Sequence, residues 1–122
     1  MKGHMSFTLF ERELLHEFRS KINRAESIEG LKHLFTYTIA ELFMKVFSDS
    51  NLEIATDAIQ YDHQKKDKYL IKEELRKHEE FSQVWDHSDL PDIVRRFAET
   101  VDKHFLYLSK HTEKTNKKIR SV

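Results

Sequence analysis

The chain has 122 residues, the length of a single domain, and its basic and acidic residues balance at 21 each. It contains no cysteine, which excludes disulfides, thiolate metal sites and cysteine nucleophiles. Two glycines and one proline argue against a turn-rich all-β fold and a glycine-rich phosphate loop, and an apolar content of 39% argues against disorder.

The first predicted helix runs over residues 8–24. Thr8 and Glu11 have the spacing of a capping box, in which a hydroxyl and a carboxylate satisfy the free amides of a helix start. Apolar residues then recur at steps of three and four and draw one stripe: Phe7, Phe10, Leu14, Phe18, Ile22 and Ala25. Residues 1–5 look like a cloning remnant, so we expect a single helical domain over residues 6–122.

The second predicted helix begins after Ser27, a good N-cap residue, and covers residues 28–47. Apolar residues occupy far more than a third of its circumference. A helix of this kind is either the buried centre of the fold or gives one face to a partner chain. Phe43 and Phe47 lie near the end of this apolar surface and are candidate interface residues.

A polar break follows, in which Ser50 and Glu53 again have the capping-box spacing. This spacing predicts a third helix that reaches residue 62. The polar segment 61–68 is then either an exposed turn of a long helix or a loop between two helices. A hairpin is the alternative, because apolar residues alternate with charged or small ones over residues 52–56.

Helical periodicity resumes from Tyr69 to Trp85. Trp85 lies at the edge of the next polar break, where it either covers the core or anchors an interface. Asp89 then serves as the cap of a last helix, whose first turn tolerates Pro91.

The last helix carries the most regular apolar pattern, a heptad seam of Leu90, Val94, Phe97, Val101, His104, Leu108, His111 and Thr115. Such seams pack against other helices at a shallow angle, as in antiparallel bundles. The sequence therefore predicts an all-α fold, a compact antiparallel bundle of four to five helices with the helix at 28–47 buried at its centre. Lysine and arginine gather in residues 110–122, which we interpret as a basic, fraying helix end.

Glu13 and His16 match the Glu-x-x-His unit of di-iron carboxylate bundles. Such a centre takes this unit from two helices, and only one copy occurs. The sequence therefore predicts no complete metal site, with these two residues as the candidate ligands. His104 and His111 lie about 10.5 Å apart along a helix, too far to ligate one ion by themselves. His63 lies in a polar break, where a solvated loop histidine is the ordinary interpretation. We predict no catalytic residue and no cofactor.

These patterns favour a non-enzymatic protein-interaction or regulatory module that forms a homodimer or binds a helical partner. The alternatives are a metal-dependent bundle enzyme and a small nucleic-acid-associated subunit that uses residues 110–122. The basic stretch is short for phosphate binding, which argues against nucleic acid. No segment approaches the ~20 apolar residues of a membrane span, and no apolar run resembles a secretory signal, so we expect a cytoplasmic protein.

Overall fold

The computed structural model describes residues 5–50 and 52–121, with side chains described as far as residue 110. Its described part is mostly helical and carries one small two-stranded sheet. The elements in chain order are α1 (Thr8–Arg24), α2 (Ile28–Val46), β1 (Ile59–Tyr61), β2 (Tyr69–Ile71), α3 (Glu73–Arg76), α4 (Glu79–Asp86) and α5 (Leu90–Ser121). No helix among the described residues is both long and apolar enough to span a membrane.

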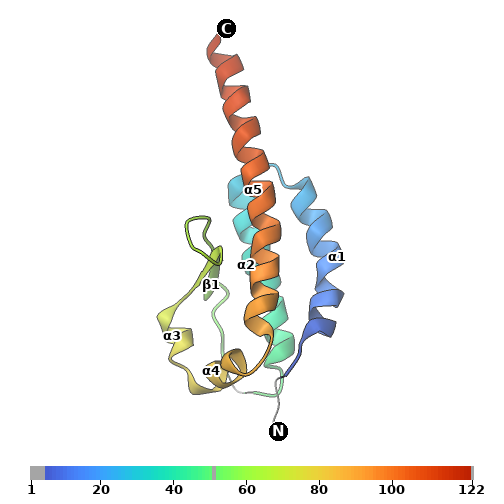
Figure 1. The fold of residues 1–122 in the computed structure, drawn as a ribbon, viewed down its shortest axis with the longest axis vertical. Helices are drawn as coiled ribbons and strands as arrows, with labels where there is room; N and C mark the ends of the chain where they lie inside the picture. The colour runs from blue at the N-terminus through green and yellow to red at the C-terminus, as the bar shows by residue number, and fades with distance from the viewer. Residues whose placement is uncertain (1–4, 51, 122) are drawn as a thin grey trace.

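Three long helices form the body of the molecule. In Figure 1, α1 and α5 run in the same direction and α2 runs in the opposite direction, with the hairpin on the side of α5 away from α1. α2 contacts α1, α5 and β1, which confirms the prediction that this helix is central. The prediction that it is enclosed on nearly all sides holds for only part of the helix: Phe43 is 2% exposed and the C-cap residue Phe47 is 7% exposed, but Tyr37 and Met44 are 62% and 68% exposed.

The apolar stripes predicted for the three long helices meet in one core. α1 contributes Phe18 and Ile22, and the first half of α5 contributes its predicted seam. Each of these side chains is worth about 1.5–3 kcal/mol when it leaves water. The fully buried seam residues are Leu90, Val94, Phe97 and Val101.

The described fold is mostly helical with five helices, as predicted, but it is not all-α, and the helix predicted from residue 50 to residue 62 is wrong. The Ser50 hydroxyl accepts a hydrogen bond from Leu52 N at 2.7 Å, and this closes a local turn where the helix was expected. The following chain pairs as an antiparallel hairpin, with Ile59 opposite Ile71. The alternative prediction of a hairpin is right in kind, but its strands lie further along than residues 52–56.

The helix predicted from Tyr69 to Trp85 is divided into three elements. Its first residues belong to β2, and the short α3 and α4 follow. Strand pairing with β1 holds Tyr69 extended, so the helix cannot begin there. The buried Phe81 and Trp85, one helical turn apart on α4, stack at 5.3 Å between ring centroids and cover one end of the core.

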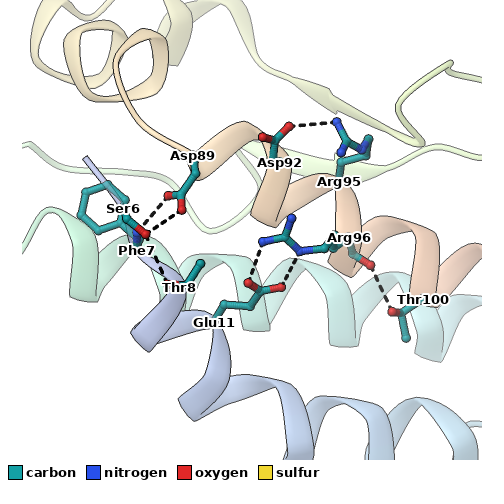
Figure 2. Close-up of polar contacts among 9 residues, drawn as sticks. All are labelled: Ser6, Phe7, Thr8, Glu11, Asp89, Asp92, Arg95, Arg96 and Thr100. Carbon is teal, nitrogen blue, oxygen red and sulfur yellow. Dashed lines mark hydrogen bonds and ion pairs between the residues drawn. The ribbon is translucent and has the colours of Figure 1, made fainter. Parts of the chain in front are cut away.

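The predicted caps of the first two helices have different outcomes. Ser27 caps α2 as predicted and accepts a hydrogen bond from Gly30 N at 3.0 Å. The capping box of Thr8 and Glu11 is wrong, because Phe7 is the N-cap of α1 and no side chain caps it. Glu11 instead turns to α5, where its two oxygens accept hydrogen bonds from Arg96, both at 2.8 Å (Figure 2).

Asp89 also joins the starts of α1 and α5. The last helix begins directly after this residue, as predicted. Its carboxylate, however, accepts hydrogen bonds from Phe7 N at 2.9 Å and from the Ser6 hydroxyl at 2.8 Å (Figure 2). The free amide of Leu90 is satisfied by the Ser88 hydroxyl instead. Together with the Glu11–Arg96 pair, this contact fixes α1 beside α5 at the same end of the molecule.

The C-terminal part of α5 projects beyond the connection between α1 and α2 (Figure 1). The helix has 32 residues, which corresponds to a length of about 48 Å. The side chains of the basic segment predicted to fray, residues 110–122, lie outside the described ones except for Lys110.

Candidate functional site

One face of α2 remains uncovered by the other residues that the structure describes. The helical repeat places its residues on the side opposite the core, and we call them the α2 outer face: Gly30, His33, Tyr37, Ala40, Glu41 and Met44. Met44 is 68% exposed and Tyr37 is 62% exposed. The ring of His33 stacks on the Tyr37 ring at 6.1 Å between centroids. Two large hydrophobic side chains, those of Tyr37 and Met44, are thus exposed on this face.

Hollows lie on both sides of Met44. One has a volume of about 220 Å³ and lies between α2 and the chain that follows it, lined by Ala40, Phe43, Met44, Phe47, Leu52, Ile54 and Thr56. The other, of about 440 Å³, is shallow and includes Phe10 of α1 and Glu41. Met44 is therefore a ridge between two depressions, a shape into which a second helix can pack.

The predicted interface residues lie beneath this face. Phe43 and Phe47 are buried, and their rings pack edge to face at 6.0 Å between centroids. Trp85 is buried as well and contacts the ring of Phe43 at 6.4 Å. These aromatic side chains hold α2 in place, and a role for them in an interface stays a prediction.

The candidate metal ligands are not brought together with further ligands in the described structure. Glu13 forms an ion pair with Lys45 at 3.2 Å, and His16 is exposed. Among the side chains described, no group of three or more histidines and carboxylates lies close enough to hold an ion. No metal chemistry is assigned to α1.

A polar cluster that the sequence did not reveal lies between the hairpin and α5. We call it the Asp102 cluster, and it consists of Tyr61, His63, Lys68 and Asp102. The Asp102 oxygen Oδ1 accepts a hydrogen bond from the Tyr61 hydroxyl at 2.5 Å and lies 2.6 Å from Nδ1 of His63. Lys68 Nζ lies 3.8 Å from the other carboxylate oxygen and donates to the His63 carbonyl at 3.2 Å.

The electrostatics of this cluster favour an ionised Asp102. Burial alone would raise the pKa of the carboxyl, but hydrogen bonds from Tyr61 and His63 outweigh burial, and the pKa lies below its ordinary value. Burial, with the nearby carboxylate, raises the pKa of Tyr61, so its hydroxyl remains a donor. The carboxylate thus holds the imidazole of His63 with Nδ1 directed at it.

The cluster connects the hairpin with a helix that lies about 40 residues further along the chain. Tyr61 ends β1, His63 lies in the hairpin loop, and Asp102 comes from α5. Phe105, one turn further along α5, packs against the rings of both Tyr61 and His63. The arrangement attaches the hairpin to α5, which is a structural task. The available sequence signal was an acidic residue next to the buried seam of the last helix.

Comparisons with known proteins give no relative of this chain. No family model matches its sequence, no curated protein matches it, and no solved structure matches its fold.

Proposed function

We propose that this protein is a non-enzymatic interaction module that pairs with a second copy of itself through the α2 outer face. The observation that carries the proposal is the exposure of Met44 and Tyr37 on a helix whose opposite side is fully enclosed. Large apolar side chains gathered on one exposed face mark interaction sites more often than apolar residues scattered singly do.

The spacing of residues on α2 supports a second copy as the partner. A two-fold axis through Tyr37 pairs residues at equal distances on either side of it in an antiparallel arrangement. Glu41 then faces His33 of the second copy, and the same pair repeats across the axis. Met44 faces Gly30, where the absence of a side chain leaves room for it.

The charges of this face suit that pairing. His33 and Glu41 are both exposed and lie on the same side of the helix. They are about 12 Å apart along their own helix, so they cannot pair within one chain. Across the two-fold axis, the imidazole of His33 can donate a hydrogen bond to the carboxylate of Glu41 in the second copy, and symmetry repeats this pair. This complementarity favours self-association over an unspecified apolar partner.

The expected affinity is modest. Each buried apolar side chain contributes about 1.5–3 kcal/mol, while association itself costs about 4–15 kcal/mol. We therefore expect a dimer that dissociates in the micromolar range.

Light scattering on size-exclusion fractions, over a series of loading concentrations, tests this function. The wild type is expected to pass from monomer to dimer, and Met44→Glu is expected to remain monomeric because a carboxylate cannot be buried there unpaired. Leu9→Glu is the matched control, since Leu9 is also 68% exposed but lies on the side of α1 opposite Phe18. A wild type that stays monomeric at the highest concentration, or a dimer unaffected by Met44→Glu, contradicts the proposal.

A further inference from the structure

A second surface, separate from the α2 outer face, lies between α1 and α5. It is an open hollow of about 580 Å³, which we call the α1–α5 groove. Among the side chains that the structure describes, the lining residues are all polar or aromatic and none is acidic: Arg19, Asn23, Thr100, Lys103, His104 and Tyr107. A volume of this size is in the range of small-molecule sites.

The two cationic residues of this groove, Arg19 and Lys103, differ from the neighbouring Arg95 and Arg96 in having no acidic partner among the described side chains. Arg95 lies 3.0 Å from Asp92, and Arg96 is held by Glu11. Within the described part of the chain, Arg19 and Lys103 form no ion pair and no hydrogen bond. Their positive charges therefore both face a hollow without a compensating carboxylate.

The nearest acidic residues on α5 are engaged elsewhere. Glu99, one turn before Lys103, lies 3.8 Å from Arg95. Asp102, the residue before Lys103, faces the hairpin and belongs to the Asp102 cluster. The groove thus presents donors almost exclusively, namely a guanidinium, an ammonium group and the Asn23 amide, and this set suits an anion with several acceptor oxygens.

An aromatic surface lies beside these donors. The rings of His104 and Tyr107 stack at 5.2 Å between centroids, and Tyr107 is 51% exposed. His104 is fixed in this position because its Nε2 donates to the Ala25 carbonyl at 3.2 Å. An exposed ring next to two cations can stack on the planar part of a ligand whose anionic group they bind.

We propose that the α1–α5 groove binds a phosphate monoester, with the phosphate held by Arg19 and Lys103 and the organic part against the Tyr107 ring. A nucleoside monophosphate and free inorganic phosphate share this anionic chemistry. The nucleotide is expected to bind more tightly, because only the nucleotide can use the ring. The proposal does not depend on dimerisation through α2.

Titration of the full chain with adenosine monophosphate and, separately, with inorganic phosphate tests this proposal by amide chemical shifts at low ionic strength. We expect the largest shifts in α1 and α5 around Arg19 and Lys103. Arg19→Gln and Lys103→Gln are each expected to weaken nucleotide binding about fivefold, the size of one exposed charge contact. Lys66→Gln, which removes an exposed charge in the hairpin loop, is the matched control and is expected to leave binding unchanged.

Tyr107→Leu separates the two sources of phosphate. It is expected to reduce nucleotide affinity to that of inorganic phosphate and to leave phosphate binding unchanged. Equal affinities of both ligands for the wild type would contradict the role of the Tyr107 ring. Shifts confined to other surfaces, or nucleotide binding that is unaffected in the Arg19→Gln, Lys103→Gln double variant, would overturn the proposal.

Discussion

The inner and outer faces of α2 differ in what covers them. The inner face, which includes Phe35 and Leu42, is enclosed by α1, α5 and the hairpin, and neither side chain is accessible to solvent. The outer face of the same helix leaves Tyr37 and Met44 exposed. The inner residues of this helix therefore form the core of the monomer, and its outer residues form the surface that we propose to bind a second copy.

Two kinds of contact enclose the inner face of α2. α1 and α5 cover it with apolar side chains, whereas the hairpin depends on polar contacts as well. Tyr61 packs against Phe35 at 6.3 Å between ring centroids and donates its hydroxyl hydrogen to Asp102. The side of α2 that faces the hairpin is thus held in part by a carboxylate on α5.

The largest expected effect comes from the inner face. Phe35→Ala is expected to lower the free energy of unfolding by about 3–5 kcal/mol, because it removes a fully buried ring and leaves a cavity. Urea denaturation followed by circular dichroism measures this change. A loss below about 1 kcal/mol would show that the inner face is not the core.

Asp102→Asn tests the polar part of the enclosure. The amide keeps the shape of the carboxylate but cannot match its acceptance of donors from Tyr61 and His63. We expect a loss of about 1–3 kcal/mol in the free energy of unfolding. Asp67→Asn, at an exposed position in the hairpin loop, is the control and is expected to change stability by less than about 0.5 kcal/mol. Equal losses of stability for the two substitutions would contradict the inference that the Asp102 cluster stabilises the fold.

The same carboxylate gives stability a dependence on pH. Because the pKa of Asp102 is lower in the folded chain than its ordinary value, its contribution is complete above the unfolded pKa of about 4. The contribution is lost as the pH falls through the lower, folded value. Urea midpoints of wild type and Asp102→Asn, measured between about pH 7 and pH 3, should therefore converge at the acidic end. A difference that grows on acidification contradicts the sign of this linkage.

The smallest effect on stability is expected at the outer face. Met44→Glu replaces a side chain that is 68% exposed, so the free energy of unfolding of the monomer should change by less than about 0.5 kcal/mol. Denaturation at protein concentrations below those of dimer formation measures this value. A large loss would mean that Met44 belongs to the core and not to an interaction surface.

The long helices could be predicted from the sequence because each repeats its apolar pattern over several turns. Two strands of three residues each give too little alternation to compete with a helical reading of Leu52, Ala55 and Ile59. Local rules also misassigned Glu11, whose spacing from Thr8 suits a cap but whose partner, Arg96, lies 85 residues away.

The Asp102 cluster could not be predicted either, because its residues are far apart in the sequence. Tyr61 and His63 lie 41 and 39 residues before Asp102, and only the fold brings them to its carboxylate. His63 therefore looked like a solvated loop residue. The prediction that α2 has more apolar surface than its own chain covers could be made locally. Tyr37 and Met44 are exposed on this helix, whereas the predicted interface residues Phe43 and Phe47 lie beneath them.

Exchanging charges between positions 33 and 41 offers the sharpest examination of self-association. His33→Glu places like charges opposite Glu41 of the second copy, and Glu41→Lys removes the acceptor of His33. Sedimentation velocity should show a weaker dimer for each single variant and a recovered dimer for the double variant, which restores opposite charges across the two-fold axis. Dimers of equal strength in all variants, or a double variant weaker than either single one, would contradict the antiparallel pairing of α2.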